Sequence, residues 1–335
     1  MKRVFGVLVV VTALLTVSAG GREKAANSED DYVLKIAYGI STNLCSAPFF
    51  IAEEKGFYKA EGLKYEAVKI DTSQIPQLIT AGTIDVALNL IASMIQPLAN
   101  GLDVKIPLTV HTGCIKVLVD PNSDIRTPAD LKGRRIGIGG MGSAPTIIVQ
   151  RYLAELGIGT MAPNIEVEWV IFPSSELPLA LERGQVDAIA VTDPAALVVE
   201  NSGKGRVVIN MTSDPQMKDE FCCVLVASSK AANAHPESLA KMARAIQKAS
   251  RYVQENPEET ARLMVEKKYL ASGDPKVNAE ALASYSWDAS VSEAKASLSR
   301  NLNDFQKIGL IPANVDVNAL LNSTFLALPG VPDRL

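Results

Sequence analysis

Short apolar runs alternate with amphipathic stretches over the first two thirds of the chain. The apolar runs predict strands at 33–40, 63–70, 84–90, 104–110, 115–119, 135–139, 165–171, 186–191, 207–211 and 222–227. Most segments between them have helical spacing, and this alternation favours an α/β fold with mostly parallel sheets. After the last run the pattern becomes helical, and it predicts helices near 237–255, 258–267, 276–286, 291–308 and 316–323.

One local pattern occurs twice along the chain. The two copies are Leu78–Leu88 (LITAGTIDVAL) and Leu181–Val191 (LERGQVDAIAV). Gly82 and Gly184 stand where a helix end needs a left-handed residue, and a β-branched residue then begins a strand. The aspartates Asp85 and Asp187 follow, and their short carboxylates can hold the turn. A repeated supersecondary unit predicts two similar α/β lobes with a cleft between them.

The N-terminus has the pattern of an export signal. Two basic residues precede the apolar run Val4–Val17, which leads into Val-Ser-Ala, a small-residue cleavage pattern. We predict a signal peptide over 1–19 and a polar tether over 20–32, and therefore a periplasmic or extracytoplasmic location. Gly20 and Gly21 stand where a lipidated precursor would carry a cysteine, so no lipid anchor is expected. A retained membrane anchor is the alternative interpretation.

Length and composition limit the classes of protein that fit. A chain of 335 residues corresponds to about two domains. Its net charge of −4 argues against a nucleic-acid partner. His111 and His235 are the only histidines, which excludes a histidine-rich zinc site and leaves few candidates for a catalytic base. The sequence contains no G-x-S-x-G elbow either. We expect no catalytic residue, no metal and no cofactor, and hence a protein that is not an enzyme.

The four cysteines include no C-x-x-C pair. Cys114 begins the apolar run CIKVLV, and Cys222 and Cys223 begin the similar run CCVLVA. If these two runs lie side by side as strands, Cys114 comes near disulfide reach of Cys222 or Cys223. The alternative is that the thiols are buried and free.

Several motifs resemble those of one known family. Ala47–Tyr58 (APFFIAEEKGFY), followed by Glu61-Gly62-Leu63, resembles the signature helix of the nitrate/sulfonate/taurine-type substrate-binding proteins of ABC importers, a family shared with thiamine-pyrimidine precursor binding proteins. The resemblance extends over about 33–330. Its further pieces are Ala81-Gly82 with Ile84–Ala87, Leu131-Lys132-Gly133 before Ile136, and Gly184 to Asp193-Pro194.

This resemblance implies a bilobal type II periplasmic-binding-protein fold without catalysis, in which two strands form a hinge near 111–117 and 221–227. Lobe 1 would comprise the discontinuous segments 33–114 and 222–335, and lobe 2 would comprise 115–221. It also implies a monomer that delivers a small-molecule solute to an ABC permease in the inner membrane. Thr192 departs from the family's usual aromatic residue, so the identity of the solute stays open.

The loops that follow the predicted strands are rich in Ser, Thr, Asn and Gly, and in open α/β sheets ligands bind at these strand ends. The predicted solute contacts are Ser41, Thr42, Asn43, Ser73, Gln74, Asn89, Ser93, His111, Gly140, Gly142, Ser143, Thr146, Ser174, Ser175, Thr192 and Asp193. These loops contain no lysine or arginine, which favours a small anion held by backbone N–H groups, a zwitterion or a neutral ring over a strongly charged anion. Asp193 is a candidate partner for an amino group. The alternatives are helix capping for the serines, a turn role for Asp193 and a structural role for His111.

The hypothesis is therefore an exported protein that captures a sulfonate, nitrate, a taurine-like compound or a heterocycle between two lobes. An enzyme on the same fold, similar to a pyrimidine-precursor synthase, is one alternative. Gly137–Gly142 also satisfies the G-x-G-x-x-G dinucleotide pattern, but an exported chain encounters little dinucleotide cofactor. The ligand-binding module of a sensory receptor is the other alternative.

Overall fold

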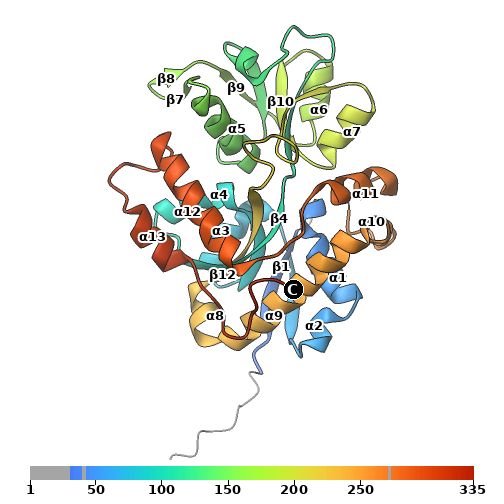
Figure 1. Ribbon diagram of the computed structural model, residues 1–335, viewed down its shortest axis with the longest axis vertical. Helices are drawn as coiled ribbons and strands as arrows, with labels where there is room; N and C mark the ends of the chain where they lie inside the picture. Colours follow the sequence, from blue (N-terminus) through green and yellow to red (C-terminus); the bar gives the residue numbers. More distant parts are fainter. Residues whose placement is uncertain (1–30, 40–42, 271–272) are drawn as a thin grey trace, which may run out of the picture. The chain divides into compact units, whose positions relative to one another are not determined.

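The computed structural model describes residues 31–39, 43–270 and 273–335, and it contains two five-stranded sheets (Figure 1). The predicted signal peptide and most of the polar tether lie outside the described residues. The first sheet has the order β2-β1-β3-β12-β4, with β1 Leu34–Gly39, β2 Tyr65–Ile70, β3 Val86–Leu90, β4 Val104–Thr112 and β12 Phe221–Ser228. The second has the order β11-β5-β10-β6-β9, with β5 Ile115–Val119, β6 Arg135–Ile138, β9 Glu168–Ile171, β10 Ala188–Thr192 and β11 Arg206–Asn210. A separate hairpin joins β7 Thr160–Met161 to β8 Asn164–Ile165.

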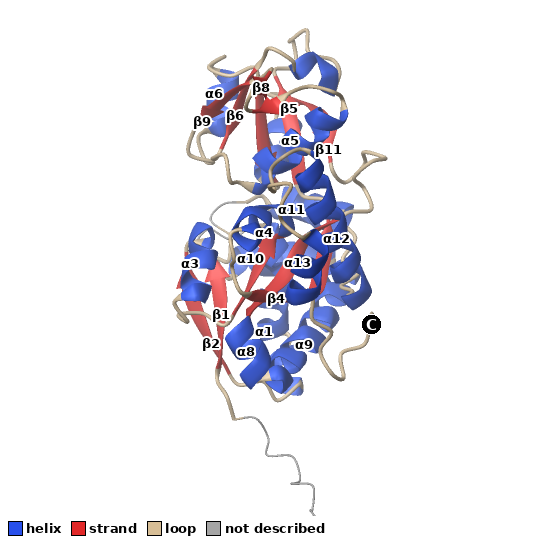
Figure 2. Ribbon diagram, turned by 90° about the vertical axis from the view of Figure 1, so that its left-hand side faces the viewer, coloured by secondary structure: helices blue, strands red, loops and turns tan. Residues whose placement is uncertain are grey.

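Helices flank each sheet (Figure 2). Those of the first lobe are η1 Leu44–Ser46, α1 Ala47–Glu54, α2 Phe57–Ala60, η2 Thr72–Gln74, α3 Ile75–Thr80, α4 Ile91–Ala99, α8 Ser229–Ala234, α9 Pro236–Glu255, α10 Pro257–Glu266, α11 Pro275–Ser284, α12 Val291–Lys307 and α13 Val317–Thr324. Those of the second lobe are η3 Pro128–Leu131, α5 Ala144–Glu155, α6 Leu177–Glu182 and α7 Ala195–Asn201. Among the described residues, no helix combines the length and apolar character that a membrane span requires.

The two sheets have the same topology, which confirms the predicted bilobal α/β fold. In the first, β1 pairs in parallel with β2 and β3, and β12 runs antiparallel between β3 and β4. In the second, β6 pairs in parallel with β9 and β10, and β5 runs antiparallel between β10 and β11. The chain passes between the sheets twice, at 113–114 and over 211–220. Each antiparallel strand is the first strand formed after a crossing.

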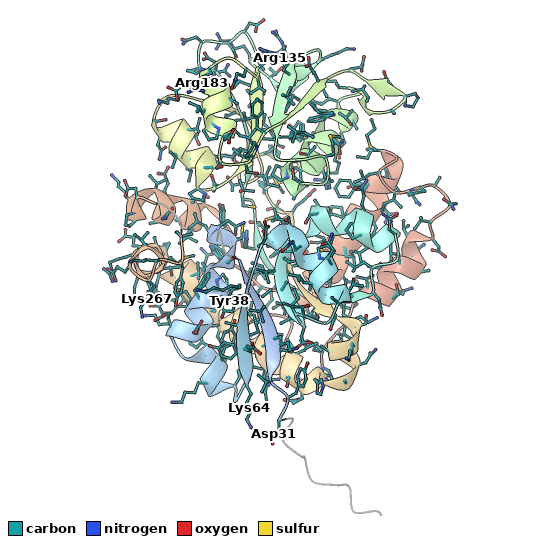
Figure 3. The ribbon with its side chains drawn as sticks, turned by 180° about the vertical axis from the view of Figure 1, so that it is seen from behind. Asp31, Tyr38, Lys64, Arg135, Arg183 and Lys267 are labelled. Carbon is teal, nitrogen blue, oxygen red and sulfur yellow. The ribbon has the colours of Figure 1, made fainter. Side chains whose placement is uncertain are left out.

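The two repeated aspartates bind the start of the neighbouring strand in their own lobe. Asp85 accepts the backbone N–H of Lys35 at 2.9 Å, and Asp187 accepts the backbone N–H of Arg135 at 2.8 Å. Arg135 also pairs its guanidinium with Asp187, at the end of β6 that lies away from the loop leading into α5 (Figure 3). The repeat in the sequence therefore encodes a junction between neighbouring parallel strands, beyond the local turn that the sequence predicted.

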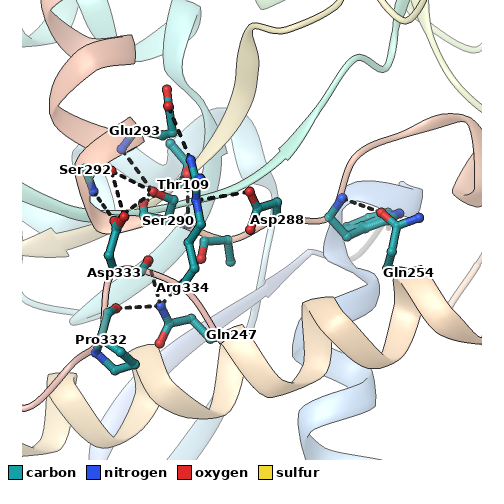
Figure 4. Close-up of polar contacts among 12 residues, drawn as sticks. Thr109, Gln247, Gln254, Asp288, Ser290, Ser292, Glu293, Pro332, Asp333 and Arg334 are labelled. Atoms are coloured by element: carbon teal, nitrogen blue, oxygen red, sulfur yellow. Dashed lines mark hydrogen bonds and ion pairs between the residues drawn. The ribbon is translucent and has the colours of Figure 1, made fainter.

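The C-terminal segment is fixed to the first lobe by polar contacts (Figure 4). Asp333 accepts the backbone N–H of Ser292 at 2.7 Å and the hydroxyl of Ser290 at 3.0 Å, at the start of α12. Gln247 of α9 donates to the carbonyl of Pro332 at 2.8 Å. These contacts connect the C-terminal segment to both α9 and α12.

The predicted pairing of the two cysteine-bearing runs is wrong. β5, which follows Cys114, pairs with β10 and β11 in the second sheet, whereas β12 pairs with β3 and β4 in the first. Cys223 instead faces His111 across the β12–β4 ladder. Cys114 nevertheless lies close to Cys222, because it occupies the crossing at the end of β4. In the structure all four cysteines are buried free thiols.

Candidate functional site

A cleft of about 650 Å³ opens at the carboxyl ends of the parallel strands and receives residues from both lobes. The first lobe supplies Asn43, Asp71, Thr72, Ser73, Pro76, Gln77, Asn89, Leu90, Ser93, Gln96 and Pro97. The second supplies Gly139, Gly140, Gly142, Ser143, Ala144, Pro145, Ser174, Leu177, Ala190, Val191, Thr192 and Ala195. These described lining residues include no aromatic, lysine, arginine or histidine side chain. The cleft is therefore suited to a small solute that is bound by hydroxyl and amide groups.

Asp71 is the only carboxylate among the described lining residues. Its Oδ1 accepts the backbone N–H of Ser73 at 2.9 Å and the Ser73 hydroxyl at 2.8 Å. The backbone hydrogen bond from Ser73 is the main reason why the pKa of Asp71 is lowered from its usual value. Asp71 thus places a stable negative charge at the cleft wall, where it would repel an anion and attract a cationic group.

Asn89 lies near the end of β3 and Ser93 lies in the first turn of α4, and both side chains bind the backbone of Leu90 between them. The Asn89 Oδ1 accepts the backbone N–H of Leu90 at 2.9 Å, and the Ser93 hydroxyl donates to the Leu90 carbonyl at 2.8 Å. Among the residues that the structure describes, the Asn89 side-chain NH₂ group has only the sulfur of Met94 as a hydrogen-bond partner, at 3.1 Å. Because sulfur is a weak acceptor, this amide remains able to donate to a solute.

On the second lobe, the glycine-rich loop after β6 brings backbone close to the cleft. A Cβ at Gly139 would lie only 2.5 Å from the Ser174 hydroxyl, so glycine is required there for Ser174 to keep its place. Ser143 is the residue before α5, but its side chain does not cap that helix. Its hydroxyl instead lies 2.8 Å from that of Thr146, which donates to the Gly140 carbonyl at 2.8 Å. The capping alternative therefore does not describe Ser143.

The structure brings nine of the predicted contact residues to the cleft: Asn43, Ser73, Asn89, Ser93, Gly140, Gly142, Ser143, Ser174 and Thr192. Gln74 and Ser175 are exposed outside its lining, and His111, Thr146 and Asp193 are buried behind it. Ser41 and Thr42 lie outside the described residues. The prediction missed Asp71, Thr72, Gln77 and Gln96. The polar turn DTSQ could have indicated Asp71 and Thr72. Gln77 and Gln96 lie on helices, so a prediction based on the loops after the strands does not include them.

Asp193 is oriented away from the cleft, into a buried polar cluster. Its Oδ2 accepts the Tyr285 hydroxyl at 2.9 Å, and Lys116 Nζ lies 3.9 Å from its Oδ1. Lys116 also pairs with Glu200 at 2.9 Å. Burial raises the pKa of Asp193 to about 6, because the nearby lysine and tyrosine only partly compensate for the loss of water. The alternative interpretation of Asp193 as a structural residue describes these contacts better than a role in binding an amino group.

Two similar α/β lobes around a polar cleft define the class of type II periplasmic binding proteins. The chain belongs to the NMT1/THI5-like family, whose model matches residues 43–260. This finding agrees with the family that the sequence motifs indicated.

Solved structures share the fold at low sequence identity. The alkanesulfonate-binding protein SsuA from Xanthomonas axonopodis pv. citri, bound to MOPS, is 19% identical with a TM-score of 0.69, over 88% of this chain and 98% of that chain. The periplasmic aliphatic sulphonate binding protein SsuA from Escherichia coli is 21% identical with a TM-score of 0.71, over 86% and 96%. The periplasmic nitrate-binding protein NrtA from Synechocystis PCC 6803 is 16% identical with a TM-score of 0.72, over 88% and 86%. No curated protein matches the sequence.

Proposed function

We propose that this protein is the extracytoplasmic solute-binding component of an ABC importer and that it binds its solute in the cleft between the lobes without converting it. The observation that carries the proposal is the cleft itself, which is lined from both lobes by hydroxyl and amide groups. The family membership and the fold shared with sulfonate- and nitrate-binding proteins support it. The export-signal pattern before the described residues supports an extracytoplasmic location and an inner-membrane permease as partner.

The charge of the cleft narrows the class of solute within this proposal. A strongly anionic solute would meet the Asp71 carboxylate and no cationic side chain among the described lining residues. A zwitterion of the taurine type avoids this conflict, because its ammonium group can approach Asp71 while its anionic end accepts backbone N–H groups. A neutral heterocycle is also compatible with the amide and hydroxyl lining. We therefore place zwitterions and neutral rings ahead of nitrate and simple sulfonates.

A thermal-shift screen of the purified protein tests this function. Amino-sulfonates, alkyl sulfonates, nitrate, pyrimidines and other small heterocycles form the panel. A true solute is expected to raise the melting temperature, because it binds only the folded state, and to bind once per chain in calorimetry. The solute should be recovered chemically unchanged after prolonged incubation. Recovery of a modified compound, with many turnovers per chain, would contradict the proposal and favour an enzyme.

Two adjacent serines provide a matched pair for testing the location of the site. Ser174 lines the cleft, whereas Ser175 does not. Ser174→Ala is expected to weaken solute binding by about 1–3 kcal/mol, because a solute group is left without its partner. Ser175→Ala should leave the affinity unchanged. Calorimetric titration of both variants with the solute identified in the screen measures the difference, and equal affinities for the two would place the solute elsewhere.

Asp71→Asn tests the sign of the charge that the solute presents to the first lobe. The amide oxygen can keep the hydrogen bonds from Ser73 while the negative charge is removed. For a zwitterion with its ammonium group near Asp71, affinity should fall about tenfold or more, since charged hydrogen bonds are stronger than neutral ones. Titration at two salt concentrations provides the check, because the loss should be smaller at high salt. Tighter binding by the variant would indicate an anionic solute instead.

A further inference from the structure

All four cysteines and His111 gather in one buried cluster outside the solute cleft. Cys45 comes from η1, His111 from the end of β4, and Cys114 from the first crossing between the sheets. Cys222 and Cys223 lie at the start of β12, just after the second crossing. Each of the five side chains is 4% exposed or less. Residues that are far apart in the sequence thus place four sulfur atoms and an imidazole at the hinge.

The ligand atoms of this cysteine–histidine cluster form two groups of three that share Cys223, and each group is compact enough to hold one ion. The Sγ atoms of Cys114 and Cys222 are 3.2 Å apart, and those of Cys222 and Cys223 are 3.6 Å apart. The ligand atoms of Cys45, His111 and Cys223 lie within 4.8 Å of one another, as do those of Cys114, Cys222 and Cys223. In a tetrahedral site with zinc–sulfur bonds of about 2.3 Å, the sulfur atoms are about 3.8 Å apart.

The two ring nitrogens of His111 have different surroundings, and the Cys222 Sγ lies 3.8 Å from Nδ1. Nδ1 also lies 3.0 Å from the carbonyl oxygen of Thr112. A carbonyl can only accept a hydrogen bond, so Nδ1 carries the proton and Nε2 keeps a free lone pair. Nε2 is buried and has no hydrogen-bond partner in the described structure. Histidines that bind metals commonly donate their other ring N–H to a backbone carbonyl in this manner.

The backbone at Cys114 provides a further observation. Cys114 has a φ of 89°, a left-handed conformation that is unfavourable for a residue with a side chain. This conformation places the Cys114 sulfur against Cys222, whereas a glycine would adopt the same φ without strain. The cluster therefore depends on a strained cysteine at the first crossing between the lobes.

We propose that the cysteine–histidine cluster binds one thiophilic metal ion of the zinc class. Cys223 belongs to both groups of neighbouring ligands and is the central ligand, and three of the four residues Cys45, Cys114, Cys222 and His111 complete a tetrahedral set. Thiolate and imidazole ligands select zinc or copper(I) over magnesium or calcium. A set of protein ligands that fills all positions is typical of a structural ion. The ion would join both crossings to η1 and would be independent of the solute in the cleft.

Metal analysis of the whole purified protein tests this proposal. The protein is purified under anaerobic and reducing conditions, stripped with a chelator and titrated with Zn²⁺ against a chromophoric competitor. We expect one zinc ion per chain, slower alkylation of the cysteines when zinc is bound, and the thiolate-to-metal absorption band when Co²⁺ replaces zinc. Copper(I) is titrated in a parallel sample, and stoichiometric binding of copper(I) alone would also support a thiophilic site.

Variants separate the cluster from adventitious binding. Cys223→Ala should weaken zinc binding about 100-fold or more, and His111→Gln should weaken it to a smaller degree. His235→Gln is the matched control, because His235 lies outside the cluster, and it should bind zinc as the parent protein does. Circular dichroism checks that each variant folds. If Cys223→Ala does not fold, His111→Gln and the stoichiometry of the parent protein decide the question.

Two results would overturn the proposal. One is a reduced, folded protein that retains neither zinc, cobalt nor copper(I) at one ion per chain. The other is a Cys114–Cys222 disulfide in the protein isolated from its export compartment, detected by peptide mapping without reduction. The 3.2 Å separation of these sulfur atoms makes the mapping decisive, because oxidation would remove two of the ligands.

Discussion

Glu220→Ala is expected to lower the free energy of unfolding by about 3 kcal/mol, because it leaves a buried charge without its nearest partner. Arg151 on α5 is 2% exposed and donates to the Glu220 carboxylate at 2.6 Å. The remaining carboxylates, Asp304 and Glu155, lie 3.8 and 3.9 Å from its guanidinium. They can compensate only in part. Urea unfolding at neutral pH, with an unchanged slope, measures the loss.

Glu155→Ala is the control for this prediction. Its side chain is 44% exposed and approaches the same guanidinium only at 3.9 Å. We expect a loss of less than about 0.5 kcal/mol, as for other exposed ion pairs. Equal losses in the two variants would show that the position of Glu220 close to the buried guanidinium has no special role. Glu220 lies in the second crossing between the sheets. A large loss of unfolding free energy would therefore also show that contacts made by this crossing stabilise the folded protein.

The fold could be predicted largely because its strands are short and apolar. The run Ile115–Val119 is observed as β5 with the same bounds, and the other strands differ from prediction by a few residues at their ends. The paired glycines and aspartates predicted the repeated lobe correctly, since a left-handed residue at a helix end is usually glycine and is therefore easy to recognise in a sequence. The hydrophobic pattern did not predict α8 or the β7–β8 hairpin, which are short elements without a clear periodicity.

The sequence could predict which loops form the cleft but not which of their side chains line it, because the direction of each side chain is set by the fold. Adjacent residues can have different surroundings that no local pattern distinguishes. Thr192 at the end of β10 lines the cleft, whereas Asp193, the next residue, is buried against Tyr285.

The cysteine–histidine cluster could not be predicted from the sequence for a related reason. No spacing in the sequence connects Cys45 with Cys223, and only the sheet order brings η1 beside the start of β12. Local patterns describe elements, but convergence of distant residues depends on tertiary packing.

Asp193→Asn is expected to remove a pH dependence of stability from the protein. The pKa of Asp193 in the folded protein is about 6, raised by burial above the usual value of 3.8. A raised folded pKa means that the neutral form is favoured by folding, so the contribution to stability is present at acid pH and is lost as pH rises through about 6. Between about pH 4 and pH 7 the wild-type protein should lose about 2 kcal/mol through this group.

The asparagine side chain cannot ionise, so the variant should gain about 2 kcal/mol relative to wild type over the same range of about pH 4 to pH 7. Urea unfolding at closely spaced pH values, with the difference between the two proteins plotted against pH, measures this gain. Asp219→Asn is the control, because the Asp219 side chain is 84% exposed and its difference from wild type should stay nearly constant. A constant difference for Asp193→Asn would mean that Asp193 remains ionised in the folded protein, with Lys116 compensating fully for its burial.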